Sequence, residues 1–211
     1  MPTERFYRLS MEKRDIIRKA AIQEFKRVSP GEASINKIIQ NADISRGSFY
    51  TYFEDKIDLL KWVMGDFIEN YRQFYLDGLK ENGGDLWELF DRVLDHTIQW
   101  VEEQGLIEIA GNMVRSNFFS EHLEQNQGEE CRMEESNRNY AVKIYEHVNL
   151  NLCNLDLDEF VELLRLQSAA LVWALKVYFT KQKDKNAIEA SYCRCMKLLR
   201  DGACPKGNEL K

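Results

Sequence analysis

Residues 34–60 read SINKIIQNADISRGSFYTYFEDKIDLL, and their spacing predicts two short helices joined by a tight turn. Ser34 is a good N-cap for the first of them, because a serine hydroxyl accepts a hydrogen bond from a backbone N–H of the first turn. The triplet ADI at 42–44 forms the turn, and Ser45 caps a second helix that reaches about residue 51. This is the helix-turn-helix arrangement, whose second helix enters the major groove of DNA.

Four aromatic residues crowd the second helix, and they divide between two faces. Phe49 is expected to face back onto the preceding helices, and Phe53 is expected to fill the junction with the helix that follows. Tyr50 and Tyr52 are expected to keep their hydroxyls at the surface, where a phenol donates hydrogen bonds to phosphate oxygens. The segment thus combines a hydrophobic anchor with a polar edge.

A short, capped helix with a polar face suits the major groove, which is about 12 Å wide and admits one α-helix. Gly47 lacks a side chain where the helix would meet DNA closely. Arg46 and Ser48 are expected to touch bases or phosphates. The alternative for these two residues is an ordinary solvent-exposed helix surface.

Three further residues are expected to contact phosphates. Asn36 and Lys37 lie on the outer face of the first short helix, and Lys56 lies at the start of the next helix, whose N-terminus itself favours anions. The complete set of candidate DNA-binding residues is Asn36, Lys37, Ser45, Arg46, Gly47, Ser48, Tyr50, Tyr52 and Lys56.

The rest of the chain also reads as helix, since no alternating strand pattern lasts more than a few residues. We therefore expect an all-α protein with about nine helices, divided into a head at 1–56, which holds a three-helix helix-turn-helix domain, and a helical body at 57–211. Besides the two short helices, the expected helices cover about 10–28, 55–80, 85–104, 107–119, 129–150, 157–183 and 186–201.

Composition and charge place the chain among soluble globular proteins. Of its 211 residues, 44% are hydrophobic and 30% are charged, and no apolar run approaches the ~20 residues of a membrane span. The start of the chain has no apolar signal segment, so a cytoplasmic location is expected. Residues 1–56 carry 11 Lys or Arg and 8 Asp or Glu, whereas the remainder carries a net charge of −9. A mildly basic head on an acidic body fits a head that binds nucleic acid.

The cysteines and the missing catalytic motifs argue against an enzyme. The cysteine count is odd, and Cys193 and Cys195 would point about 200° apart on a helix, which favours reduced structural thiols over a metal or redox site. The sequence contains no glycine-rich phosphate loop, no G-x-S-x-G and no H-E-x-x-H. We expect no cofactor and no catalytic residue. The remaining alternative is a helical protein–protein adaptor that retains the head fold without binding DNA.

The stretch at 34–60 resembles the DNA-binding head of the tetracycline-repressor (TetR) family, and residues 10–62 share the resemblance. Asp43 departs from the family pattern, which has glycine in the turn; aspartate tolerates the left-handed conformation, so the turn should survive. The positions that match are Ser34, Ile35, Ile38, Ala42, Ile44, Ser45, Gly47, Tyr50, Tyr52, Phe53, Lys56 and Leu59.

The resemblance implies a regulator of transcription whose body binds a small molecule and forms a homodimer. The expected mechanism is a repressor dimer that occupies a palindromic operator and is released by its effector. The segment at 157–179 is apolar on more than one face, so the helices near 157–183 and 186–201 are the expected dimer interface. The alternative is a helix fully buried in a monomer.

The effector pocket of the body has only loose candidates in the sequence. Aromatic and apolar residues are expected to line it, with two polar residues near them as ligand partners. The alternative for each lining residue is ordinary core, which is the commoner role of such residues. The candidate residues are Trp87, His96, Trp100, Met113, Asn117, Phe118, Phe119 and Tyr140.

Overall fold

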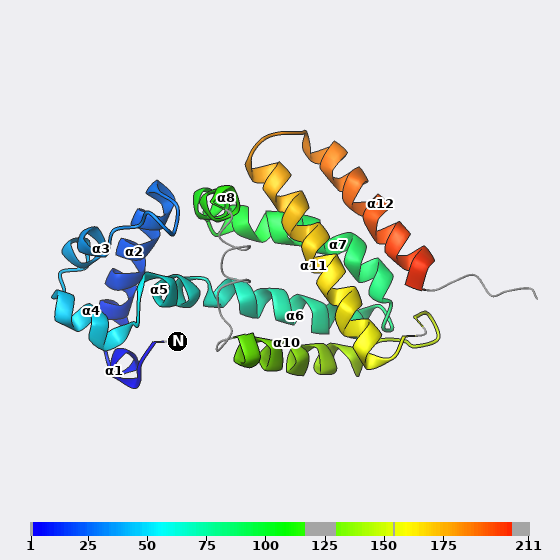
Figure 1. Cartoon of the computed structure of the whole chain (residues 1–211), viewed down its shortest axis with the longest axis horizontal. Coiled ribbons are helices and arrows are strands. Elements are labelled where there is room, and N and C mark those ends of the chain that lie inside the picture. The colour runs from blue at the N-terminus through cyan, green and yellow to red at the C-terminus, as the bar shows by residue number, and fades with distance from the viewer. Residues whose placement is uncertain (1, 117–129, 154, 204–211) are drawn as a thin grey trace, which may run out of the picture. The chain divides into compact units, whose positions relative to one another are not determined.

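The computed structural model describes residues 2–116, 130–153 and 155–203, and it describes the side chains of all these residues except 130–137 and 203. The secondary structure in these ranges is entirely helical, which confirms the all-α fold with a helix-turn-helix near the N-terminus (Figure 1). The helices are α1 (Glu4–Tyr7), α2 (Met11–Arg27), α3 (Ile35–Asn41), α4 (Arg46–Tyr52), α5 (Lys56–Val63), α6 (Gly65–Glu81), α7 (Leu86–Glu103), α8 (Ile107–Arg115), α10 (Glu130–Tyr145), α11 (Leu157–Phe179) and α12 (Lys185–Ala203).

The described residues form eleven helices, where the sequence predicts about nine. One addition is α1, a single turn that precedes the first expected helix. Its Phe6 is fully buried, with its ring centroid 4.8 Å from that of Phe53 and 4.7 Å from that of Trp62. A helix this short is unstable alone, so α1 exists because of this aromatic packing.

The second addition arises because the structure has two helices, α5 and α6, where the sequence predicts a single helix over 55–80; that prediction is wrong. The backbone of Met64 (φ −87°, ψ 1°) ends α5, and α6 begins at Gly65. Arg18 of α2 stabilises the break: its Nη2 donates to the carbonyl oxygen of Val63 at 3.2 Å and to Oδ2 of Asp66 at 2.6 Å. A carbonyl freed from the helix thus receives a charged donor, which offsets the lost helical hydrogen bond.

The described residues group into two compact units. The head unit comprises residues 2–69 and 104–116, and the body unit comprises residues 70–103, 130–153 and 155–203. The head unit therefore contains α5, which begins at Lys56, and also the start of α6 and all of α8, which lie beyond residue 56. The boundary after residue 56 that the sequence suggests, between a DNA-binding part and a part for effector binding and dimerisation, stays a prediction.

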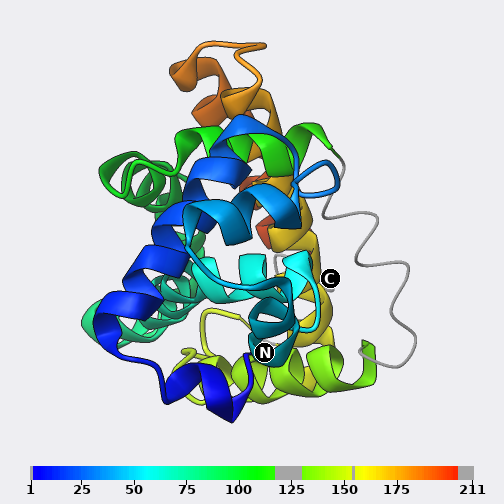
Figure 2. The same ribbon diagram turned by 90° about the vertical axis from the view of Figure 1, so that its left-hand side faces the viewer.

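Helix α2 lies at the centre of the head unit, and α3, α5 and α8 all pack against it (Figures 1 and 2). Ile17, Ala21 and Phe25 of α2 are fully buried, at the spacing of a single helix face. Asn112 of α8 secures the C-terminal end of α2, where carbonyl groups lack helical partners. Its Nδ2 lies 2.9 Å from the carbonyl oxygens of both Phe25 and Lys26 and 3.3 Å from that of Val28.

We expect Asn112→Asp to destabilise the head unit by about 2 kcal/mol. The change removes the donor and places a carboxylate against carbonyl oxygens at the negative end of the α2 dipole. Asn41→Asp is the matched control, because Asn41 is exposed and its side-chain hydrogen bond to Gln23 is long, at 3.4 Å. Urea denaturation measures both free energies of unfolding. Equal, small losses in the two variants would show that the contact contributes nothing.

The body unit is built on α7, which packs against α11 and α12, while α10 packs against α11 (Figure 1). Its apolar core contains a chain of hydrogen bonds: Tyr75 donates to Oε1 of Gln167 at 2.9 Å, and Nε2 of Gln167 donates to Tyr192 at 2.8 Å. The Tyr71 hydroxyl donates to that of Tyr75 at 3.0 Å, and burial raises the pKa of Tyr71 to about 12. These paired groups fix how α6, α11 and α12 meet, because any slip would bury an unpaired polar atom.

Candidate nucleic-acid interface

The turn between α3 and α4 has the geometry that the sequence predicts. The side chains of Ser34 and Ser45 cap the two helices by accepting from the N–H groups of Lys37 and Ser48. Asp43 adopts φ +48°, which confirms that aspartate takes the left-handed turn position. Nζ of Lys13 donates to the carbonyl oxygens of Ala42 (3.0 Å) and Asp43 (2.9 Å), which attaches the turn to α2.

The aromatic residues of α4 divide between inside and outside. Phe49 and Phe53 are fully buried, as expected, whereas 48% of Tyr50 is exposed. Tyr52 is half-buried, and its ring meets that of Phe6 edge-on at 6.0 Å between centroids. Two rings therefore anchor the helix, and the ring of Tyr50 is offered to solvent.

The N-terminal segment holds the end of α4. The backbone N–H of Thr3 donates to the carbonyl oxygen of Tyr52 at 3.0 Å, and the Thr3 hydroxyl donates to that of Thr51 at 2.8 Å. Both carbonyls lie in the last turn of α4, where no helical N–H is available. Helix α4 is therefore capped at both ends, and its orientation is fixed before any ligand arrives.

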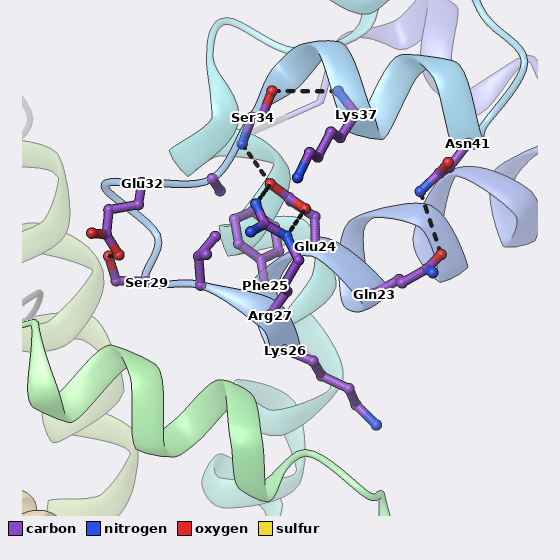
Figure 3. A network of polar contacts seen from close by, with 12 residues as sticks. Gln23, Glu24, Phe25, Lys26, Arg27, Ser29, Glu32, Ser34, Lys37 and Asn41 are labelled. Atoms are coloured by element: carbon purple, nitrogen blue, oxygen red, sulfur yellow. Dashed lines mark hydrogen bonds and ion pairs between the residues drawn. The ribbon is translucent and has the colours of Figure 1, made fainter.

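Glu24 connects α2 to the start of α3 (Figure 3). Its carboxylate is 3% exposed and receives two donors from Arg27, at 2.7 and 2.9 Å, and the backbone N–H of Ser34 at 2.9 Å. The hydrogen bonds from Arg27 hold the pKa of Glu24 below its usual value, although burial acts in the opposite direction. Since Ser34 is also the N-cap of α3, this one carboxylate positions the whole helix.

We expect Glu24→Gln to lower the free energy of unfolding at neutral pH by on the order of 1–2 kcal/mol. Because folding lowers the pKa of Glu24, its carboxylate stabilises the fold at pH above its ordinary value of 4.5, and this contribution is lost as the pH falls through the folded-state pKa. The difference in the free energy of unfolding between wild type and Glu24→Gln should therefore become smaller in acid. Glu32→Gln, which alters an exposed carboxylate beside Ser29, is the control and should change stability by less than about 0.5 kcal/mol. A gap that is independent of pH would contradict the account.

The outward face of α3 and α4 brings together most of the candidate DNA-binding residues. Nη1 of Arg46 donates to Oδ1 of Asn36 at 2.8 Å, and the guanidinium lies over the ring of Tyr50, with Cζ 5.7 Å from its centroid. The side chain of Lys37 is exposed on the same helix as Asn36. The other candidates at this face are Ser45 and Gly47, which are exposed, and Ser48, which is half-buried.

Lys56 differs from the other DNA-binding candidates because its ammonium group binds backbone carbonyls of the head unit. Its Nζ donates to the carbonyl oxygens of Gly31 and Ala33, the latter at 3.2 Å. These bonds attach the start of α5 to the loop before α3 and use two of the three ammonium donors. Lys56 also lines a shallow groove of about 340 Å³ with Asn36 and Arg46. Its expected phosphate contact stays a prediction.

The candidate pocket residues of the body do not form one cluster, unlike the DNA-binding candidates on α3 and α4. His96 stacks on Phe74 with 3.9 Å between ring centroids, and its Nε2 lies 3.0 Å from Oδ1 of Asn70; burial lowers the pKa of His96. Trp87 is buried, with no hydrogen-bond partner for Nε1 among the described residues. The Tyr140 hydroxyl lies 3.4 Å from the carbonyl oxygen of Arg72.

The remaining pocket candidates are scattered. Trp100 is half-buried in α7, and Met113 is buried in the head unit. Asn117, Phe118 and Phe119 lie outside the described residues. A groove of about 710 Å³ in the body unit has none of the candidates among its lining residues, which include Arg138, Leu163, Leu166 and Leu199.

Within residues 2–116, 130–153 and 155–203, no group of three or more His, Cys, Asp or Glu side chains could hold a metal ion. No helix in these ranges is long and apolar enough to cross a bilayer.

Sequence reasoning missed the residues that support the interface from behind. Glu24, Arg18 and Asn112 look like ordinary helix-surface residues, because the backbone groups that they bind, those of Ser34, Val63 and Phe25, lie 10, 45 and 87 positions away. Phe6 is the one partly visible in the sequence, because an adjacent pair of aromatic residues, Phe6 and Tyr7, stands within the charged segment TERFYR. A local pattern reveals only the pairing of Glu24 with Arg27, three residues on.

Comparisons with known proteins agree with this geometry. A family model described as bacterial regulatory proteins, tetR family, matches residues 17–63. A solved structure of a TetR family transcriptional regulator from Chloroflexus aurantiacus J-10-FL is similar, with 21% identity, a TM-score of 0.54, and 96% of this chain and 98% of that chain covered. A putative TetR-family transcriptional regulator from Syntrophomonas wolfei str. Goettingen is similar at 18% identity and a TM-score of 0.54, with 93% and 98% covered. None of the curated proteins matches the chain significantly.

Proposed function

We propose that this chain, whose residues 17–63 match the model of the tetR family of bacterial regulatory proteins, is a regulator of that family, which acts on transcription in the cytoplasm as a repressor dimer that binds a palindromic operator and is released by a small-molecule effector. One observation carries the proposal. The helix that would enter DNA, α4, is capped at both ends and anchored by two buried rings, while its outer face presents Arg46 and Tyr50 to solvent.

DNA binding would use this face in two ways. With seven residues, α4 is about 10 Å long and fits within the major groove. Arg46 and Ser48 would contact bases, while Lys37, Tyr50 and Tyr52 would donate to phosphate oxygens and set the register. Lys56 would add a phosphate contact with its remaining N–H.

Dimerisation would use the predicted helices near 157–183 and 186–201. Leu166 and Trp173 of α11 are 56% and 42% exposed, and Leu198 of α12 is 73% exposed. Large apolar side chains on the two C-terminal helices support an interface with a second copy over a helix buried in a monomer. A two-fold axis there would present two copies of α4 to half-sites one DNA turn apart.

Release by an effector would require movement in the body to reach the head. Two contacts of α2 would transmit such a movement. Arg18 of α2 binds the junction of α5 and α6, and Asn112 of α8 binds the C-terminal end of α2. Both α6 and α8 are continuous in sequence with body helices. An effector that binds one arrangement of these helices better than another would shift the spacing of the two α4 helices and lower operator affinity.

Selection of bound sequences from random double-stranded DNA tests the proposal. The purified protein at one fixed salt concentration is expected to enrich a palindrome with half-site centres about one helical turn apart. Enrichment of a non-palindromic site would contradict the dimer. If the folded protein enriches no sequence, the adaptor alternative is favoured. The selected duplex then serves as the probe in a search for effectors.

A further inference from the structure

We infer that Arg46 reads a guanine in each half-site and that Asn36 and Tyr50 are positioning residues that hold its guanidinium for this contact. The inference rests on the proposed function, and it assigns Asn36 a role other than the phosphate contact expected from the sequence. It starts from a cluster of three side chains, defined here as the Arg46 clamp, that α3 and α4 bring together on the exposed face of the head unit.

Three contacts define the Arg46 clamp. Nη1 of Arg46 donates to Oδ1 of Asn36 at 2.8 Å, and Nη2 lies 3.4 Å from the Tyr50 hydroxyl. The guanidinium carbon lies 5.7 Å from the Tyr50 ring centroid, within the range of a cation–π contact. A free arginine side chain samples many rotamers, and these contacts remove much of that freedom before DNA arrives.

Rigid elements hold both partners of the arginine. Asn36 lies in the first turn of α3, which Glu24 fixes through the N–H of Ser34. Tyr50 lies one turn beyond Arg46 on α4, next to the buried ring of Phe49, with 5.3 Å between the ring centroids. The position of the guanidinium therefore depends on helix geometry and not on a mobile loop.

The chemistry of the clamp suits a base more than a phosphate. Both partners of Arg46 are neutral, so its charge is not cancelled, and at least three of its five N–H groups remain for DNA. A guanidinium held at one angle can donate two parallel hydrogen bonds to O6 and N7 of guanine, the commonest specific contact of arginine. A phosphate contact needs no such fixed angle, because phosphate oxygens accept from many directions. A well-formed arginine–guanine pair discriminates against other bases by roughly 5- to 150-fold.

The test compares wild type, Asn36→Ala, Arg46→Ala and the double variant on the selected duplex and on duplexes with each guanine of the half-site replaced in turn. Replacement of one guanine is expected to lower the affinity of wild type by roughly 5- to 150-fold. The same replacement should not change the affinity of Arg46→Ala. Asn36→Ala should lower this discrimination several-fold, and the double variant should match Arg46→Ala. Tyr50→Phe, which keeps the ring and loses the hydroxyl, should keep most of the discrimination.

Lys37→Ala is the control on the same face. It should weaken binding to every duplex alike and flatten the salt dependence of the affinity, because it removes one cationic phosphate contact. All the altered residues are exposed, so the thermal unfolding midpoints of the variants should match wild type.

The inference is overturned if Asn36→Ala weakens binding equally at all positions and its effect adds to that of Arg46→Ala, since that is the behaviour of an independent phosphate contact. It is also overturned if Arg46→Ala changes no base preference. Failure of the proposed function looks different, because wild type itself would then select no sequence.

Discussion

Phe53→Ala is expected to destabilise the head unit by about 3–5 kcal/mol, the largest effect that we predict for a single substitution. Phe53 is fully buried, and its ring centroid lies 4.8 Å from that of Phe6, 5.7 Å from that of Phe49 and 6.0 Å from that of Trp62. Removing the ring leaves a cavity where α1, α4 and α5 meet. Because domain stabilities are themselves about 5–15 kcal/mol, the head would lose a large share of its stability.

Tyr50→Ala is the matched control for this prediction. Tyr50 is an aromatic residue of the same segment, but 48% of it is exposed, so its removal should change stability by less than about 1 kcal/mol. Urea denaturation followed by circular dichroism measures both variants, and hydrogen exchange locates the change to residues 11–63. Tyr50→Ala should weaken DNA binding while the protein stays folded. Comparable stability losses in the two variants would contradict the assignment of Phe53 to the core and of Tyr50 to the surface.

Gly84→Ala is expected to destabilise the body unit by about 3 kcal/mol. Gly84 has φ +83°, which costs an L residue about 1–2 kcal/mol. In addition, a Cβ at this position would lie 2.6 Å from both the backbone N of Asn149 and the carbonyl oxygen of His147. Since both are backbone atoms, the segment after α10 would have to move, and the hydrogen bond from Asn149 N–H to Gly84 O (3.0 Å) would break.

The neighbouring glycine separates the two causes. Gly83 has φ +71°, but a Cβ there would meet nothing within 4 Å. Gly83→Ala should therefore cost only the backbone strain, about 1 kcal/mol, and the difference between the variants measures the close approach. Denaturation midpoints of the two variants provide the comparison. Equal losses of stability in the two variants would contradict the prediction, because residues 147–149 would then move away from the new Cβ without an energetic cost.

The parts of the fold that sequence reasoning predicted correctly are those that depend on neighbours in the chain. The hydroxyls of Ser34 and Ser45 cap α3 and α4 through N–H groups three residues away, and Asp43 forms the turn with its own backbone angle. The burial of Phe49 and Phe53 follows from helical spacing. Such features are visible in a sequence because a few adjacent residues determine them.

The break at Met64 was missed because tertiary contacts stabilise it. Neither methionine nor one following glycine forces a helix to end, and the segment has no proline. Arg18 provides the donor for Val63 and the ion pair with Asp66, and it lies 45 and 48 positions away from them. Helix α1 has the same kind of origin, since its four residues fold only against the ring cluster around Phe6.

The effector pocket could be predicted only as a set of residue types. Aromatic residues line pockets and fill cores alike. Trp87 is buried in the body unit, and Met113 is buried in the head unit. Residues of a core and residues that line a pocket are both buried, so burial alone does not distinguish the two roles. His96 is the most informative of the candidates, because its stacking on Phe74 and its contact with Asn70 combine an aromatic surface with polar atoms.

The central claim is that the exposed face of α3 and α4 reads a DNA sequence. The most direct measurement compares the dissociation constants of the purified protein for its selected duplex and for a scrambled duplex of equal length and composition, at one salt concentration. Binding that is at least about 10³-fold tighter to the selected duplex is expected of a sequence-specific regulator. Equal affinities, with the protein folded and dimeric, would contradict the claim.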